Sequence, residues 1–429
     1  MRKDLLDRIS ALAVCIAVVA ETFTITSCDK SEAVDTKPAD YGSYGADIAR
    51  EIATRFPDRS AYSSGEQATG EYIESQIKEL GFETEVQTFY SPEGGQSANY
   101  IVKIEGTGFY CLQDNGVYSI EHRVAVIGTH YDAALSPEYI EEENEEESEE
   151  EESEEPAYVF DGISDNASGT ACVLTALKAF KDYKDVAFDV WFVFFGAGTA
   201  EQAGSEFFCQ SLSSEELGSI DVMFDVDSLY AGDKVYASSG YSSLLPNKRY
   251  AMRRKTYQTY DTCFENTLMT NYGFDLLTNE SGVKTDINED GYNEIFNEVP
   301  LTISDYRPFD ARLIPVVYIE SFDYNFTSID QMKETKNLSL QDFDGHVRGT
   351  PSDCMSYLDS LLVEEDIDKD EDGEIDCSGD RLQIRINCVA FIIDETLLKG
   401  SDKGMTLPAY SKYLKESEKQ ANASETSGT

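Results

Sequence analysis

The sequence predicts an α/β fold, a three-layer sandwich around a mixed, mainly parallel central sheet. Short apolar runs bounded by polar residues alternate along the chain with stretches of helical periodicity, as in a sheet that is covered by helices on both faces. The 429 residues, 41% of them hydrophobic, are enough to form a sizeable core.

The elements of the predicted domain can be followed in chain order. Ile73, Ile77 and Leu80 recur at helical spacing before Gly81, which indicates an amphipathic helix that ends at a glycine. Residues 82–89 then alternate like a strand. Buried strands are predicted at 123–127, 186–195 and 222–226, and a helix whose buried face includes Val173, Leu174, Leu177 and Phe180 lies between the first two.

Residues 1–28 are predicted to be a lipoprotein signal peptide. A basic-leaning start precedes an apolar stretch, residues 9–20, that is too short to span a bilayer comfortably. The following Ile25-Thr26-Ser27-Cys28 resembles the lipobox of bacterial lipoproteins, in which Cys28 would carry the lipid. An ordinary signal peptide is the alternative, and either interpretation predicts an exported protein. As a lipoprotein it would lie at the cell surface or in the periplasm and contact the membrane only through its N-terminal lipid anchor.

The rest of the chain divides by composition. Residues 29–40 are predicted to be a tether, residues 41–415 the folded domain, and residues 416–429 a disordered tail. Within the domain, residues 137–157 form an acidic insert, where twelve glutamates between Glu141 and Glu155 repel one another and predict disorder. The formal net charge of −48 excludes nucleic acid as a partner and favours divalent cations as counter-ions.

The residues with catalytic potential indicate a metal site. The chain has three histidines and no Gly-x-Ser-x-Gly motif, so a nucleophilic Ser or Cys mechanism is disfavoured. His130 and Asp227 each follow a predicted buried strand, and Asp165 precedes a predicted helix. Because the carboxyl ends of such strands meet at one edge of a sheet, these three side chains are predicted to bind one cation there. Asp132 is predicted to orient the His130 ring.

Four short motifs carry a resemblance to a known family. They occur in the order Gly-Thr-His130-Tyr-Asp132, Ser-Asp165-Asn-Ala-Ser-Gly, Phe-Phe-Gly-Ala197 and Phe-Asp-Val-Asp227. Together they resemble the motifs of the co-catalytic zinc aminopeptidases, which include bacterial leucyl aminopeptidases and glutamate carboxypeptidase and whose fold glutaminyl cyclases share. The resemblance covers residues 41–398 and implies a zinc aminopeptidase-like domain. It also implies that His130 and Asp227 bind one zinc ion and that Asp165 bridges it to a second.

The chain departs from the family pattern at two ligand positions. The family's adjacent Glu-Glu pair, general base and then metal ligand, aligns with Gly198-Thr199, which leaves Glu201 as the nearby candidate base. The family's last ligand is a His before Thr-Pro-x-Asp, but here Gly349 holds that position and His346 lies three residues upstream. His346 would reach the metal only if the intervening loop bulges. One or two zinc ions are therefore expected.

Two acidic loops resemble EF-hand calcium loops. Residues 366–380 place Asp368, Asp370, Asp372 and Asp376 at the ligand spacing of such a loop, with a glycine at the turn, and residues 286–298 repeat the scheme. Both lack a glutamate at position twelve, although Asp380 or Glu298 follows immediately. A solvated acidic turn is the alternative in each case.

The resemblance implies a zinc-dependent exopeptidase that is aminopeptidase-like and releases residues from peptides outside the cytoplasm. The alternative is a catalytically inactive, peptidase-like surface lipoprotein that binds a peptide or another partner, because the Glu-Glu pair is replaced by Gly198-Thr199. A glutaminyl cyclase-like activity ranks third, since that chemistry retains a glutamate that this chain lacks. The substrate, the zinc count, the disulfide pairing and the oligomeric state are left open by the sequence.

Overall fold

The computed structural model describes residues 36–139, 159–285, 294–295, 297–362 and 379–426, which belong to one compact unit. The predicted signal peptide with Cys28 lies outside the described residues, as do most of the tether and most of the acidic insert. The same holds for the proposed calcium ligands Asp368, Asp370, Asp372 and Asp376. No helix of the described part is long and apolar enough to span a membrane.

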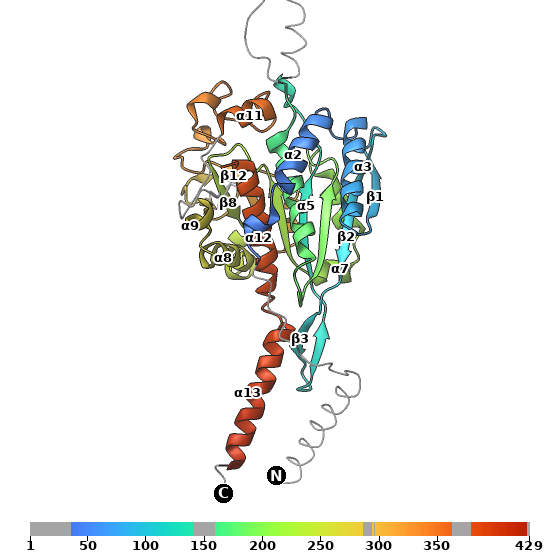
Figure 1. The fold of residues 1–429 in the computed structure, drawn as a ribbon, viewed down its shortest axis with the longest axis vertical. Coiled ribbons are helices and arrows are strands. Elements are labelled where there is room, and N and C mark those ends of the chain that lie inside the picture. Colours follow the sequence, from blue (N-terminus) through green and yellow to red (C-terminus); the bar gives the residue numbers. More distant parts are fainter. Residues whose placement is uncertain (1–35, 140–158, 286–293, 296, 363–378, 427–429) are drawn as a thin grey trace, which may run out of the picture. The chain divides into compact units, whose positions relative to one another are not determined.

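An eight-stranded sheet forms the centre of the domain (Figure 1). From one edge to the other its strands are β1 (Glu85–Tyr90), β2 (Gln96–Ile104), β6 (Asp189–Phe195), β5 (Val124–His130), β7 (Ile220–Asp227), β12 (Val316–Phe322), β8 (Lys234–Ser238) and β9 (Leu276–Leu277). The four consecutive strands β6, β5, β7 and β12 run parallel, whereas β1, β2 and β8 pair antiparallel with their inner neighbours. The predicted mixed, mainly parallel sheet is confirmed.

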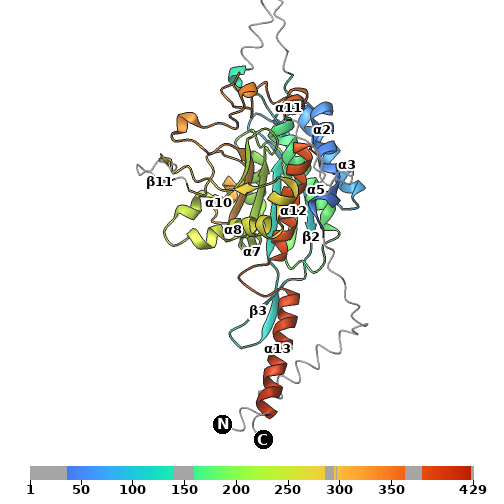
Figure 2. The same ribbon diagram turned by 60° about the vertical axis from the view of Figure 1, so that its left-hand side comes forward.

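Helices cover both faces of this sheet, as predicted (Figures 1 and 2). One face carries α2 (Tyr44–Arg55), α3 (Ser64–Glu79), α5 (Gly169–Phe180), α8 (Arg249–Glu265) and α12 (Arg381–Leu398). The other carries α6 (Ala203–Ser211), α7 (Ser214–Ser219) and α10 (Arg307–Ala311). Short helices α9 (Leu268–Tyr272) and α11 (Met355–Leu361) and the turns η1 (Pro38–Tyr41), η2 (Ile163–Ser168), η3 (Tyr241–Leu244), η4 (Ile329–Gln331) and η5 (Leu338–Leu340) complete the layers.

Side chains along each central strand point alternately to the two faces of the sheet, and this produces one hydrophobic core on each face. In β5, Ala125 and Ile127 face the core under α5 and α12, whereas Val126 faces the core under α6 and α10. All seven residues of β5 are buried. A strand that is buried on both faces reads as a continuous apolar run, and this is why the sequence predicted it.

The start and end of α3 agree with local sequence. The Ser63 side chain accepts a hydrogen bond from the Glu66 backbone N–H, which caps the first turn. The helix ends just before Gly81, whose φ of +84° is the left-handed conformation that a glycine adopts at low cost.

The C-terminal segment differs from the expectation of disorder. Residues 416–426 continue α13 (Leu407–Thr426), and Tyr410 of this helix stacks on Tyr110 with ring centroids 4.2 Å apart. Tyr110 belongs to the separate antiparallel pair β3 (Phe109–Leu112) and β4 (Tyr118–Glu121). Packing of aromatic rings at the start of α13 and a run of good helix formers after it account for the helix, because polar composition alone does not oppose helix formation.

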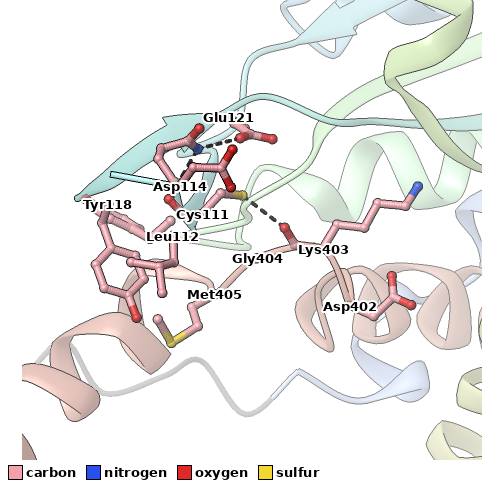
Figure 3. Close-up of a pocket in the computed structure, with 11 residues that line it drawn as sticks. Cys111, Leu112, Asp114, Tyr118, Glu121, Asp402, Lys403, Gly404 and Met405 are labelled. Atoms are coloured by element: carbon pink, nitrogen blue, oxygen red, sulfur yellow. Dashed lines mark hydrogen bonds between the residues drawn. The ribbon is translucent and has the colours of Figure 1, made fainter. Parts of the chain in front are cut away.

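A pocket of about 500 Å³ lies beside this strand pair (Figure 3). Residues 110–114 and 402–405 line most of it, and the Cys111 thiol donates to the Lys403 carbonyl at 2.9 Å. The pair precedes the amino end of β5, whereas His130 ends that strand. This pocket is therefore at the opposite end of β5 from the predicted site. A further two-stranded pair, β10 (Lys284–Thr285) and β11 (Glu294–Ile295), lies outside the main sheet.

Candidate metal centre

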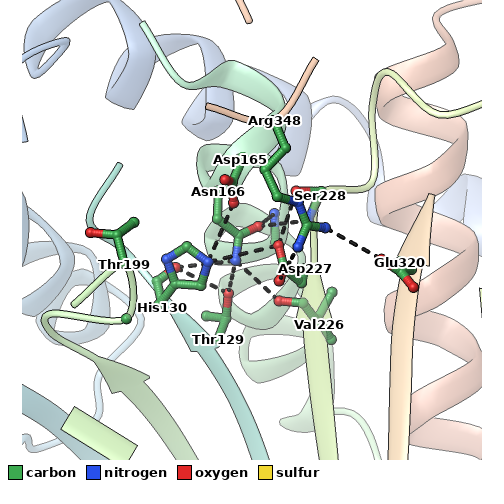
Figure 4. Close-up of polar contacts among 12 residues, drawn as sticks. Thr129, His130, Asp165, Asn166, Thr199, Val226, Asp227, Ser228, Glu320 and Arg348 are labelled. Carbon is green, nitrogen blue, oxygen red and sulfur yellow. Dashed lines mark hydrogen bonds and ion pairs between the residues drawn. The ribbon is translucent and has the colours of Figure 1, made fainter. Parts of the chain in front are cut away.

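The last residue of β5, His130, lies at the carboxyl edge of the parallel strands, and only 6% of its surface is exposed. Asn166 ties this strand end to its neighbours: its amide donates to Thr129 Oγ1 at 2.9 Å and to the Val226 carbonyl at 3.2 Å. The same side chain accepts from the Ser228 N–H at 3.0 Å. The ends of β5 and β7 are thereby held together (Figure 4).

The orientation of the His130 ring leaves one nitrogen for a ligand. Nδ1 faces the Asp132 carbonyl at 3.1 Å and the Asp132 carboxylate at 3.4 Å. Both oxygens only accept, so Nδ1 carries a proton, and Nε2 is the nitrogen that faces the other two predicted ligands and would bind a metal. Asp132 therefore lies where the sequence predicted, although its backbone carbonyl makes the shorter contact.

Asp165 is positioned by a buried carboxylate behind it. Asp353 accepts hydrogen bonds from the backbone N–H groups of Ser164 and Asp165, at 2.8 and 2.9 Å. This contact fixes the turn η2 from which the Asp165 side chain projects toward His130. Burial and the nearby charge of Asp165 raise the pKa of Asp353 well above its ordinary value.

Asp227 ends β7 and presents its two oxygens to different partners. Oδ1 lies 3.7 Å from His130 Nε2 and accepts from the Ser228 hydroxyl at 2.9 Å. Oδ2 contacts Arg348 and accepts from the Tyr318 hydroxyl, both at 3.2 Å. Burial would raise the pKa of Asp227, but the charges of Arg348 and His130 lower it below its ordinary value, so the carboxylate stays ionised.

His130, Asp165 and Asp227 form a buried group in which one potential ligand atom from each lies within 4.8 Å of the others. His130 Nε2 is 3.4 Å from Asp165 Oδ1 and 3.7 Å from Asp227 Oδ1. Tetrahedral zinc with bonds of about 2.0–2.1 Å separates its ligand atoms by about 3.3–3.4 Å, so small side-chain movements complete the site. Apart from its 3.4 Å contact with His130 Nε2, the buried Asp165 Oδ1 has no hydrogen-bond donor within reach, which is expected of an atom whose partner is a metal ion. The donor set fits zinc.

The charge state of His130 follows from its neighbours. Burial lowers its pKa, but hydrogen bonds with Asp132, Asp165 and Asp227 outweigh burial and raise the pKa well above its ordinary value. The metal-free protein therefore holds a proton on this ring at neutral pH, and a metal ion must displace it.

The loop after β6 shows how the fold accommodates Gly198-Thr199 in place of the family's Glu-Glu pair. The Asp132 carboxylate accepts from the Gly198 N–H at 2.7 Å and from the N–H and hydroxyl of Thr199 at 2.9 and 2.5 Å. Gly198 packs directly on His130. Neither residue offers a carboxylate, and both help to hold the imidazole.

Two of the predicted site residues lie outside the three-residue group. Glu201 is exposed on the loop before α6. His346 is about half exposed, and its Nδ1 lies 3.2 Å from Glu334 Oε2. Their proposed roles as base and ligand remain predictions.

The carboxylates that follow the two calcium-like loops have other partners. Asp380 caps α12 and pairs with Arg50 at 2.7 Å, and Glu298 pairs with Arg249 at 2.9 Å and with Arg253. In this structure both carboxylates therefore form ion pairs with arginine side chains.

Sequence reasoning missed several supporting residues. The fully buried Arg59 donates to four backbone carbonyls, those of Phe56, Tyr131, Asp161 and Gly162. Glu66 accepts from the Ala197 and Tyr62 N–H groups and the Ser97 hydroxyl, and burial together with the charge of Asp132 raises its pKa to about 7. Arg348 and Glu320 were also missed. Buried contacts of this kind leave no periodic signal in the sequence.

The fold and the site define an α/β protein with a buried, metal-capable His/Asp/Asp group at the carboxyl edge of a mixed sheet. The chain belongs to peptidase family M28, whose sequence profile matches residues 115–347. Members of this family typically use zinc. The family that the motifs predicted is thus confirmed.

Comparisons with individual proteins agree with this membership. The alkaline phosphatase isozyme conversion protein of Escherichia coli (strain K12) is 25% identical over 211 residues, which cover 48% of this chain and 55% of that relative. The match thus spans about half the length of each protein. A glutaminyl cyclase from an Acidobacteriales bacterium has a TM-score of 0.51 at 16% identity, over 85% of this chain and 98% of that one. An aminopeptidase from Aneurinibacillus sp. strain AM-1 has a TM-score of 0.50 at 14% identity, over 86% and 96%. Both structures share the fold.

Proposed function

We propose that the protein is a zinc-dependent exopeptidase, aminopeptidase-like, that releases residues from peptides outside the cytoplasm. The convergence of His130, Asp165 and Asp227 on one point, in a member of a peptidase family, carries the proposal. The basic and apolar N-terminal residues with Cys28 support export, and the fold shared with an aminopeptidase supports the exopeptidase class.

The chain's own residues hold and tune the centre. When bound, zinc supplies a Lewis acid that polarises the carbonyl of a peptide bond. His130 would hold it through Nε2, while the Asp132 carbonyl keeps the proton on Nδ1. Asp165 and Asp227 would supply the negative charge. Glu201, on the loop after β6, is the residue we propose as general base, because it is the carboxylate two residues after Gly198-Thr199, where the family pattern places its Glu-Glu pair.

The test is amino-acid release from a panel of peptides with free N-termini, with zinc added. Release is expected from the purified protein, its loss from Asp165→Ala, and a large reduction from Glu201→Gln. Asp330→Asn changes an exposed carboxylate in η4 and serves as the matched control. No release from any peptide by a protein that has bound zinc would count against the proposal.

A second candidate is a catalytically inactive relative that binds peptides or another partner. The contact between Gly198 and His130 favours it, because this backbone is packed for a glycine and the position carries no carboxylate to move a proton. Turnover that Asp165→Ala abolishes would refute it. Adding peptides with N-terminal glutamine to the panel tests the cyclase-like activity, which the shared fold keeps in consideration.

A further inference from the structure

Arg348 places a guanidinium group inside the metal centre. Its Nη1 lies 3.2 Å from Asp227 Oδ2, and its Nη2 lies 3.4 Å from Glu320 Oε2 (Figure 4). One fifth of the side chain is exposed. An arginine carries its charge at every working pH, so this cation is a permanent part of the site.

The two carboxylate oxygens of Asp227 face different cation positions, the predicted metal site and the Arg348 guanidinium. Oδ1 faces His130, on the side where a metal would bind, and Oδ2 is held by Arg348 and the Tyr318 hydroxyl. With Oδ2 engaged, Asp227 can offer a metal only one oxygen. The arginine thus fixes how the aspartate coordinates.

Glu320 is the second carboxylate that needs the arginine. It is fully buried in β12, opposite Asp227 in the register of β7 and β12. The Tyr318 hydroxyl lies 3.2 Å from Asp227 Oδ2 and 3.1 Å from Glu320 Oε2, so both carboxylates surround one small volume. The guanidinium of Arg348, in contact with both, stabilises negative charge on these two neighbouring buried carboxylates.

The two positions at which the family carries its further metal ligands offer none here. Gly198 and Thr199 carry no carboxylate, and Thr199 is bound to Asp132. Gly349 adopts a φ of +67°, and a Cβ there would lie 2.6 Å from Ser136 Oγ. A histidine at that position would be strained, and the neighbouring Arg348 is the cation that contacts both Asp227 and Glu320.

We propose that the centre takes one divalent ion, at His130, Asp165 and Asp227, and that Arg348 permanently occupies the place of a second cation between Asp227 and Glu320. This inference rests on the metal site of the proposed function. Arg348 is a positioning residue: it acts through Asp227 and excludes a second ion.

The test is metal stoichiometry of the purified full chain, measured by elemental analysis after equilibrium dialysis against zinc. The wild type is expected to bind one ion. Arg348→Ala leaves Asp227, Glu320 and the Tyr318 hydroxyl facing an empty space, and a second ion is expected there. Arg348→Lys, which keeps the charge, is expected to stay at one.

Two further arms separate this role from a merely structural one. Millimolar guanidinium, far below denaturing concentrations, is expected to return Arg348→Ala to one ion by refilling the space. The double variant Arg348→Ala, Glu320→Gln removes the second carboxylate and is expected to bind one. Arg312→Ala breaks a comparable pair with Glu206 away from the site and is expected to leave one ion.

The outcomes are distinguishable. Two ions in the wild type, or one ion in a folded Arg348→Ala, would overturn the proposal for Arg348 while the metal site stands. No ion in either protein would overturn both. Should Arg348→Ala fail to fold, the neutral Arg348→Gln takes its place, with two ions expected and one ion contradicting the proposal. If neither folds, a second ion in Arg348→Lys or in the wild type overturns it, and one ion in both supports it.

Discussion

Gly198 lies so close to His130 that a Cβ built on the glycine would be 2.3 Å from the His130 Cβ. No ordinary pair of carbon atoms approaches so closely, so a side chain at this position must displace the imidazole or the loop after β6. The glycine is therefore part of what places His130.

Gly198→Ala is expected to destabilise the protein by about 1–3 kcal/mol through overpacking and to weaken zinc binding. Thermal unfolding and zinc titration measure the two effects. Gly218→Ala is the matched control, because a Cβ at that helical position in α7 meets no atom within 4 Å. Equal zinc affinity in both variants would show that His130 does not depend on the contact.

Asp353→Asn is expected to lower the stability by about 1–3 kcal/mol, because one of the two buried N–H groups of η2 loses its acceptor. Zinc affinity is expected to fall as well, since Asp165 is carried by that turn. Asp330→Asn, at an exposed position, provides the comparison. Unchanged unfolding in the Asp353 variant would mean that the turn holds its shape without this carboxylate.

Arg59→Met is expected to cost at least about 3 kcal/mol, because four buried carbonyl groups lose a charged donor at once. The carbonyls of Tyr131 and Gly162 lie beside the predicted ligands, so metal binding should weaken too. Chemical denaturation of this variant and of Arg307→Met, whose side chain is exposed, gives the measurement. A loss no larger than that of the control would contradict it.

Zinc binding is expected to weaken as the pH falls. The pKa of His130 is raised well above its ordinary value, so below that pKa the ion must displace a proton. One displaced proton makes the apparent dissociation constant rise about tenfold for each unit of pH lowered. Titration calorimetry in buffers with different protonation enthalpies counts the proton directly.

His346→Gln is the control for this dependence, because His346 pairs with Glu334 outside the three-residue group. The same slope is expected in that variant. If the zinc dissociation constant of the wild type did not change with pH, zinc binding would not displace a proton from His130.

The fold could be predicted because its central strands are continuous apolar runs and its helices keep one apolar face. The three predicted ligands could be located for the same reason: His130 and Asp227 follow two of those runs, and parallel strands bring their ends to one edge. Helix α13 includes residues 416–426, and its first turns pack through Tyr410 on Tyr110, a contact between segments distant in the sequence that no local pattern indicates.

The charge arrangement of the centre could not be read from the sequence. Glu320 lies inside an apolar strand, and only the register of β12 against β7 brings it beside Asp227. Arg348 reaches both from a loop whose path no local pattern specifies. Likewise, the close approach of Gly198 to His130 is a property of backbone geometry, so an alignment shows a missing glutamate but not the reason for it.

The most direct test of the central claim is anomalous diffraction at the zinc absorption edge from crystals grown with zinc. The expected result is one anomalous peak per chain, about 2.0–2.2 Å from His130 Nε2, Asp165 Oδ1 and Asp227 Oδ1. A peak that is absent from these three atoms, in crystals of protein saturated with zinc, would contradict the assignment of the site.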